Sequence, residues 1–192
     1  MTDKFCKFCG ATHTGTAFPL HCGACNTTTW FSPSPVAVIL QTVMGNDGNM
    51  GVLIGRRNIE PGKGKWALPG GFIDSTDLTA QAAAARELHE ETGFEVQDPD
   101  TMTVTSTFSD GRHFLIFVEN MNYLTEEEVR TKFVPNSECE EVMVVYEPVD
   151  LCFPAHTEAL RQCLEVNRVV GLLDEADDMD FEDEIEDEEL WR

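Results

Sequence analysis

Three glutamates crowd one short stretch of the sequence. Glu87, Glu90 and Glu91 stand at positions i, i+3 and i+4, so on an α-helix they fall within an arc of roughly 100° and share one face. Like charges at this spacing repel one another and weaken a helix. Oxygen-rich clusters of this kind bind hard divalent cations such as Mg²⁺ or Mn²⁺, which accompany substrate phosphates. The spacing therefore predicts a divalent-metal site, and a solvated acidic helix face is the alternative.

The neighbouring residues favour the metal site over the solvated face. Gly70 and Gly71 lie upstream, where a backbone carbonyl can approach a metal without a Cβ in the way. Arg86 can bridge to the neighbouring carboxylates and hold them in place. The four alanines at 82–85 allow the same helix to pack tightly on a sheet.

Four of the seven cysteines form two Cys-x-x-Cys pairs. Cys6 and Cys9 make the first pair, and Cys22 and Cys25 the second. The thiolates of one pair can both bind a single ion from a tight turn, and a glycine in or beside each pair relieves the backbone there. We therefore expect residues 1–31 to form a structural zinc ribbon rather than a redox pair or two disulfides. Its expected role is to brace the fold or a dimer interface, so a homodimer is a further expectation.

The composition restricts the classes of protein to which the chain can belong. Its 192 residues, 42% of them hydrophobic, can bury one sizeable core and leave a small accessory unit over. No apolar run approaches the roughly 20 residues that cross a bilayer, and the first ten residues lack the layout of a secretory signal. An odd number of cysteines fits a reducing compartment. We therefore expect a cytoplasmic protein with no membrane partner.

The formal net charge of −22 is unevenly distributed. Residues 174–192 contain 12 acidic residues and one arginine, and so carry half of the excess charge. An acidic protein repels the phosphate backbone, which argues against nucleic acid as a partner. We expect residues 172–192 to form a disordered, solubilising tail. The alternative is an acidic motif that docks on a basic protein partner or folds over the chain's own basic loop.

The elements that position these groups can be predicted from hydrophobic periodicity and turn residues. An apolar run over 36–43, a turn over 46–49 and a second run over 51–57 predict a β-hairpin. A helix is expected from about Leu78 to Thr92, because Gly93 is a residue type that commonly follows a helix. Strands and helices alternate along the chain, which predicts a mixed α/β layered fold. The remaining predicted elements are strands near 101–108, 113–119 and 141–146 and a final amphipathic helix over about 155–170.

The stretch 71–94 resembles the signature of the Nudix hydrolases, G-x5-E-x7-R-E-U-x-E-E-x-G-U, where U is a bulky apolar residue. Its second half, 86–94, matches without a gap and contains all three glutamates, which are named the box glutamates below. In the first half Asp77 stands where the family has Glu, and eight residues rather than seven separate it from Arg86. This departure leaves the role of Asp77 open, with Asp74 as its rival.

The resemblance implies a Nudix-type α/β/α sandwich with a mixed sheet over residues 32–171, preceded by the zinc ribbon. A four-cysteine ribbon before such a domain is similar to a subgroup that includes ADP-ribose and FAD pyrophosphatases. It implies an enzyme that uses Mg²⁺ or Mn²⁺ to hydrolyse the pyrophosphate of a nucleoside diphosphate linked to another moiety, such as ADP-ribose, FAD or an NADH-like dinucleotide. The product is a nucleoside monophosphate. The competing hypothesis is a catalytically weak module that senses ADP-ribose and acts through a protein partner.

The match also implies which residues bind metal and which act on the substrate. The box glutamates bind the divalent ion, and a carbonyl of Gly70 or Gly71 completes its shell. The general base varies within the family and often comes from a loop after the box. Glu138 is the candidate here, with Glu140 and Glu141 as alternatives. The expected catalytic residues are Glu90, Glu138 and Asp77.

A basic island in this acidic chain is the expected phosphate anchor. Four of the thirteen Lys and Arg residues fall between Arg56 and Lys65. Their positive charge can attract substrate phosphates, and solvated charges at the end of a strand are the alternative. The residues predicted to bind substrate are Arg56, Arg57, Lys65 and Arg86.

Overall fold

The computed structural model describes residues 4–179, with side chains described up to residue 169. Contacts between residues divide the chain into two compact units. The first unit comprises residues 1–34 with 109–114, and the second comprises residues 35–108 with 115–192. Within the described part of the chain, every helix is too short or too polar to cross a bilayer.

The first unit contains two tight turns of the same kind, one at each Cys-x-x-Cys pair. The N–H of Gly10 donates to the Cys6 carbonyl at 2.9 Å, and the N–H of Asn26 donates to the Cys22 carbonyl at 2.8 Å. Gly10 and Asn26 both adopt positive φ, which glycine and asparagine tolerate better than other residues. The strands of this unit are β1 (Leu20–His21) and β2 (Thr28–Thr29), which pair antiparallel.

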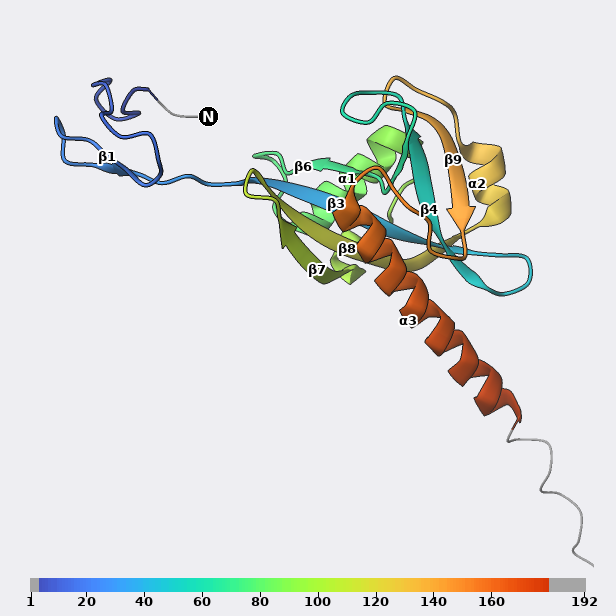
Figure 1. The fold of residues 1–192 in the computed structure, drawn as a ribbon. Helices are drawn as coiled ribbons and strands as arrows, with labels where there is room; N and C mark the ends of the chain where they lie inside the picture. The colour runs from blue at the N-terminus through green and yellow to red at the C-terminus, as the bar shows by residue number, and fades with distance from the viewer. Residues whose placement is uncertain (1–3, 180–192) are drawn as a thin grey trace, which may run out of the picture. The chain divides into compact units, whose positions relative to one another are not determined.

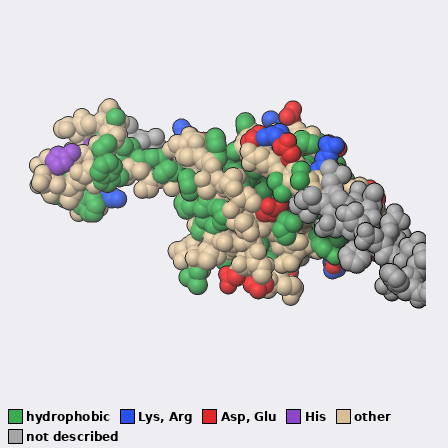
Figure 2. Space-filling view, turned by 90° about the horizontal axis from the view of Figure 1, so that it is seen from below, with side chains coloured by type: hydrophobic (Ala, Val, Ile, Leu, Met, Phe, Trp, Pro, Cys, Tyr) green, Lys and Arg blue, Asp and Glu red, His purple; other side chains and the backbone are tan. Residues whose placement is uncertain are grey.

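The surface of this unit differs from the average composition of the chain. Residues 4–34 contain no Asp or Glu, although the whole chain has 35. The surface of this unit in Figure 2 shows apolar, His and Lys side chains. Phe5, Phe8 and Trp30 are exposed there. The acidity of the chain therefore belongs to the rest of the sequence.

The second unit is built around a seven-stranded mixed sheet. Its main path runs in the order β5-β4-β3-β8-β7, and β6 and β9 pair with β3 and β4 respectively. The long central strands β3 and β4 form the predicted hairpin. The strands are β3 (Ser34–Met44), β4 (Met50–Arg57), β5 (Trp66–Ala67), β6 (Gly70–Phe72), β7 (Thr103–Ser109), β8 (His113–Thr125) and β9 (Cys139–Val145).

Helices cover both faces of this sheet. Ile39 of β3 belongs to a core cluster with the buried side chains of α1 (Ala80–Thr92), whereas its neighbour Leu40 belongs to a second cluster with those of α3 (Pro154–Met179). Successive side chains of a strand point to opposite faces, so β3 contributes to both clusters. Figure 1 shows α1 and α3 on opposite sides of β3 and β4. The α/β/α sandwich is confirmed.

The helix that carries the box glutamates begins two residues later than predicted. Thr79 caps it, since the Thr79 side chain accepts the N–H of Ala82 at 3.0 Å. Gly93 ends it with φ 78°, as the sequence predicts. The sequence did not predict two short elements, the 3-10 helix Pro99–Thr101 and α2 (Glu126–Lys132).

The last helix is longer than predicted. It continues to Met179 instead of ending near residue 170, so the first part of the predicted disordered tail is helical. Residues 172–179 are Leu, Asp, Glu, Ala and Met, most of which favour helix, and no proline interrupts them. The rest of the predicted tail, residues 180–192, lies outside the described part of the chain.

Candidate functional site

Arg86 is the centre of a hydrogen-bond network among the carboxylates of α1. Its Nη1 donates to Glu87 Oε1 at 2.7 Å and to Glu90 Oε2 at 2.9 Å. Its Nε and Nη2 donate to the two oxygens of Asp77 at 3.2 and 2.8 Å, and Nη2 also donates to the Phe72 carbonyl at 2.9 Å. Five bonds use the full donor capacity of a guanidinium. Arg86 therefore bridges the carboxylates, as expected from the sequence, and its role in binding substrate stays a prediction.

Asp77, whose role the sequence motif left open, forms an ion pair with Arg86. Its side chain is 7% exposed, and it accepts the backbone N–H of Asp74 at 2.8 Å in addition to the bonds from Arg86. The Arg86 hydrogen bond holds the pKa of Asp77 below its usual range. An ionised carboxylate with these partners orients the guanidinium, and the catalytic role of Asp77 stays a prediction.

Glu87 and Glu91 are buried, whereas Glu90 is exposed. Glu91 Oε2 accepts the N–H of Gly70 at 3.3 Å, and burial raises the pKa of Glu91 to about 8. Burial also raises the pKa of Glu87. A Cβ on Gly71 would lie 2.4 Å from Glu87 Oε2, so the missing side chain makes room for this carboxylate. Two carboxylates are thus held inside the fold at a desolvation cost that a cation would offset.

Oxygen donors of this kind fit a hard divalent cation, although they have not converged on one point. Among the described residues, the cysteine cluster is the one group of three or more Cys, His, Asp or Glu side chains whose ligand atoms all lie within 4.8 Å of one another. The box glutamates do not meet that criterion, and Arg86 Nη1 bonds to both Glu87 and Glu90. The carboxylates therefore have an internal cation already.

Glu138 lies near the box glutamates. A small cavity is lined by Arg57, Glu91, Glu138 and Cys139, among others. Burial is the main cause of the raised pKa values of Glu87 and Glu91, and closer charged neighbours also contribute. The negative charge of Glu138 raises both pKa values a little further. The structure thus brings the predicted general base within electrostatic reach of two box glutamates.

The side chain of Asn136 joins the loop of Glu138 to the end of α1. Its Nδ2 donates to the carbonyl of Glu91 at 2.9 Å and to that of Glu90 at 3.3 Å. Its Oδ1 accepts the N–H of Glu138 at 2.8 Å and that of Cys139 at 2.9 Å. The sequence analysis missed this residue, because an asparagine in a polar loop carries no signal of contacts 45 residues away.

The alternative bases bind a different partner. Glu140 Oε1 lies 2.8 Å from Arg56 Nε, and Glu141 Oε2 lies 3.1 Å from Arg56 Nη1. Arg56 was predicted to bind substrate, but these ion pairs hold it to β9. Of the three candidate bases, Glu138 is therefore the one that makes no ion pair with Arg56, and the phosphate-binding role of Arg56 stays a prediction.

Of the residues of the basic island that were predicted to bind substrate, Arg57 and Lys65 make no ion pair with the described residues. Arg57 Nε donates to the Pro61 carbonyl at 2.8 Å, and its guanidinium lies 5.4 Å from the centre of the Phe153 ring. Lys65 is exposed, and its side chain makes no ion pair with the described residues. A cation on an aromatic ring beside an exposed lysine suits a phosphorylated ligand. The sequence analysis did not single out Phe153 for this contact.

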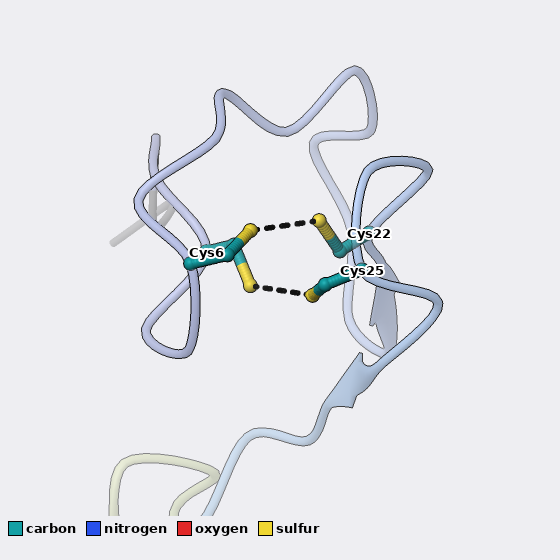
Figure 3. Close-up of side chains that lie close together, drawn as sticks. Cys6, Cys22 and Cys25 are labelled. Atoms are coloured by element: carbon teal, nitrogen blue, oxygen red, sulfur yellow. Dashed lines mark hydrogen bonds between the residues drawn. The ribbon is translucent and has the colours of Figure 1, made fainter.

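The four cysteines of the first unit converge, and Figure 3 shows three of them labelled. Cys6 Sγ lies 3.7 Å from Cys25 Sγ, and Cys9 Sγ lies 3.7 Å from Cys22 Sγ. Four thiolates placed tetrahedrally about 2.3 Å from a zinc ion are about 3.8 Å apart. A hydrogen bond to the backbone of Phe8 lowers the pKa of Cys6 to about 6, which favours the metal-binding thiolate. The cluster fits the predicted zinc ribbon.

Part of the chain is similar in sequence to a known transcriptional repressor. Over 65 residues it is 38% identical to the ADPR responsive transcriptional repressor NtrR of Acinetobacter baylyi. That stretch is 33% of this chain and 26% of the repressor, so the chain spans about a quarter of the relative's length.

Solved structures share the fold of the second unit. A NUDIX hydrolase from Nitrosomonas europaea has a TM-score of 0.57 and 22% identity over 85% of this chain and 91% of its own. NrtR of Shewanella oneidensis has a TM-score of 0.52 and 19% identity over 66% of this chain and 60% of its own. These identities support the fold alone. The family model of the NUDIX domain matches residues 33–165, which hold the sheet and the box glutamates, so the chain belongs to the Nudix family.

Proposed function

We propose that this protein is a metal-dependent hydrolase that cleaves the pyrophosphate of a nucleoside diphosphate linked to another moiety and releases a nucleoside monophosphate. The observation that carries the proposal is the burial of Glu87 and Glu91 against the backbone of Gly70 and Gly71. Burial raises the pKa of both carboxyl groups, so a bound divalent cation would relieve the cost of ionising them together.

The chain's own residues have distinct roles in this proposal. Mg²⁺ or Mn²⁺, when bound, would stabilise charge on the pyrophosphate oxygens and lower the pKa of the attacking water. The box glutamates would hold it, together with the carbonyl of Gly71. Arg86 sets the spacing of Glu87 and Glu90, and Asp77 fixes the orientation of Arg86.

Glu138 is the proposed general base. It lines the cavity that also contains Glu91, and its charge acts on the box glutamates. Its competitors Glu140 and Glu141 are paired with Arg56. Glu138 would accept the proton that the attacking water loses.

ADP-ribose is the substrate that we put first. The repressor with the 38% identical stretch is named as ADPR responsive. Lys65 and Arg57 would attract the phosphates, and the ring of Phe153, on which Arg57 lies, offers a flat apolar surface beside them. FAD and NADH-like dinucleotides contain the same pyrophosphate linkage and come next.

The same relative favours a second function, a module that binds ADP-ribose without cleaving it and acts through a protein partner. Arg86 Nη1 already neutralises part of the charge of Glu87 and Glu90, so these two carboxylates have a positive partner without a divalent ion. A nucleotide could then bind at the basic island while turnover stays slow.

AMP release from ADP-ribose, FAD and NADH in Mg²⁺ or Mn²⁺ tests both functions, with ADP-ribose binding measured in parallel by calorimetry. We expect the wild type to release AMP and Glu91→Gln to lose on the order of 100-fold in kcat, because charge stabilisation in the transition state is lost. Glu95→Gln is the matched control, since Glu95 is exposed and follows the helix. Turnover retained in Glu91→Gln would contradict the metal assignment. Binding without turnover in the wild type would support the sensing module instead.

A further inference from the structure

The segment that carries Glu138 has no regular secondary structure to position it. Residues 133–138 connect α2 to β9, and the β4 to β9 ladder is irregular between Arg56 and Arg57, where the segment joins it. The carboxylate of Glu138 accepts no hydrogen bond from any residue that the structure describes. The backbone therefore sets where this side chain starts and in which direction it leaves, and that backbone is fixed by hydrogen bonds from outside the ladder.

The side chain of Asn136 fixes this backbone locally. The Oδ1 of Asn136 accepts the backbone N–H groups of Glu138 and Cys139 at 2.8 and 2.9 Å. The backbone N–H of Asn136 donates to the Cys139 carbonyl at 2.9 Å. Asparagine commonly closes a turn in this way. The direction in which the Glu138 side chain leaves the backbone therefore depends on Asn136.

The same side chain ties the turn to the helix of the box glutamates. Its Nδ2 donates to the carbonyls of Glu90 and Glu91, in the last turn of α1. The last carbonyls of a helix have no partner within the helix, so an external donor binds them well. The side-chain amide of Asn136 thus bonds through Nδ2 to the backbone of two box glutamates, and through Oδ1 to the backbone of the proposed base Glu138.

Asn58 holds the turn from the opposite side. Its N–H donates to the Glu138 carbonyl at 2.7 Å, and its Nδ2 donates to the Asn136 carbonyl at 3.0 Å. Asn58 directly follows β4. The turn is therefore fixed between the end of α1 and the end of β4, and Asn136 supplies the link to α1.

We propose that Asn136 is a positioning residue for the hydrolysis, which sets the distance between the Glu138 carboxylate and the box glutamates that would hold the divalent ion. This inference rests on the proposed function. A displacement of about 1 Å at a reacting group can cost on the order of 100-fold in rate. A residue that only capped α1 would instead affect stability and leave the chemical step unchanged.

Two substitutions separate the bonds of Asn136. Asn136→Asp keeps the acceptor that closes the turn and removes both donors to α1, whereas Asn136→Ala removes all four side-chain bonds. Asn122→Asp is the matched control, because Asn122 is an exposed asparagine on β8 whose Nδ2 donates to Thr101 Oγ1. The assay measures kcat and KM for the dinucleotide that the wild type cleaves fastest, the affinity for Mn²⁺ without nucleotide, and the thermal midpoint.

We expect both Asn136 variants to lose about 10- to 100-fold in kcat, with KM and Mn²⁺ affinity changed by less than about threefold. In a Glu138→Gln background the Asn136→Asp substitution should cost less than about twofold, because its effect passes through Glu138. If Asn136→Ala fails to fold, Asn136→Asp and this double variant carry the test.

Additive effects in the double variant, or a lower thermal midpoint with an unchanged kcat, would overturn the positioning role. An active wild type with an equally active Asn136→Asp variant overturns this inference alone. A wild type that binds Mn²⁺ and cleaves no dinucleotide overturns the proposed function, and this inference with it.

Discussion

The two candidate metal centres differ in how complete they are without an ion. In the first unit the four Sγ atoms of the cysteines already lie within 4.8 Å of one another. On α1, Arg86 bonds to Glu87 and Glu90 and supplies the positive charge itself. Structural zinc sites are closed, whereas catalytic sites keep a position open for exchange. We therefore expect the first centre to retain a bound ion and the second to exchange one.

The pKa values of individual ligands are shifted at both centres. A hydrogen bond to the Phe8 backbone lowers the pKa of Cys6 to about 6, so its metal-binding form is present near neutral pH. Burial raises the pKa of Glu91 to about 8, so its metal-binding form has to be stabilised by the ion. Hydrogen bonds to neighbouring cysteines, above all Cys25, raise the pKa of Cys9, so ionising the ligands has a cost at both centres. We expect the ion at the second centre to bind less tightly because Glu87 and Glu90 still bond to Arg86, whereas the four thiols already converge.

The largest expected effect is at the cysteine cluster. Cys22→Ser should reduce the zinc content from about one ion per chain to near zero and unfold residues 4–34, because so small a unit has too little core without its metal. The second unit should keep its fold, since its core clusters contain no residue of the ribbon. Elemental analysis measures the zinc content, and amide NMR spectra show which of the two units stays folded.

Cys152→Ser is the matched control, because Cys152 is a free thiol outside the cluster. It should keep full zinc content. Full zinc content in Cys22→Ser as well would mean that the cluster is not a four-ligand site.

A smaller effect is expected where Gly71 makes room for a carboxylate. In Gly71→Ala the new Cβ would lie 2.4 Å from Glu87 Oε2 and 2.5 Å from its Cδ, so the carboxylate has to move. We expect kcat for dinucleotide hydrolysis to fall by about 100-fold, as for other misplaced reacting groups, with an unchanged zinc content. Steady-state kinetics and elemental analysis check the two parts.

Gly23→Ala is the control in the other unit. A Cβ at Gly23 meets nothing within 4 Å, so hydrolysis and zinc content should both be unchanged. Full activity in Gly71→Ala would show that the position of Glu87 is not critical. That result would contradict the assignment of Glu87 to a divalent-metal site.

Features that depend on neighbours in the sequence were predictable. The zinc cluster rests on two pairs of cysteines, each closed by its own turn. The common face of the box glutamates follows from helical geometry alone, and Gly93 ends that helix with φ 78° as predicted. The apolar run from 36 to 43 predicted a buried strand, and its two faces are covered by α1 and α3.

Features that depend on distant contacts or on weak local signals were not predictable. The bond from Asn136 to the Glu91 carbonyl spans 45 residues, and the pairing of Arg56 with Glu140 and Glu141 depends on how β4 and β9 align. The seven-residue helix α2 has too few turns to show a period, and its only signal is the capping box at Thr125.

The smallest expected effect concerns a buried base outside both centres. His156 is 5% exposed, its Nδ1 has no partner among the described residues, and its ring packs on Phe117 and Phe153. Burial, with a contribution from Arg57, lowers the pKa of His156 to about 3. Below pH 6.5 the unfolded chain binds a proton that the folded chain does not, so stability falls as the pH drops from about 6.5 toward 3.

Between pH 6.5 and pH 5 this loss amounts to about 2 kcal/mol, or roughly 4–8 °C in the thermal midpoint for a chain of this size. His156→Leu should remove most of that acid slope, while His89→Leu, at an exposed histidine of α1, should leave it unchanged. Thermal melts of the three proteins across this pH range measure the slopes. An equal slope in His156→Leu and the wild type would assign the acid sensitivity to other ionisable groups, among them carboxyl groups with lowered pKa values such as Asp110 and Glu128, and the first two predictions would then have to be compared at one fixed pH.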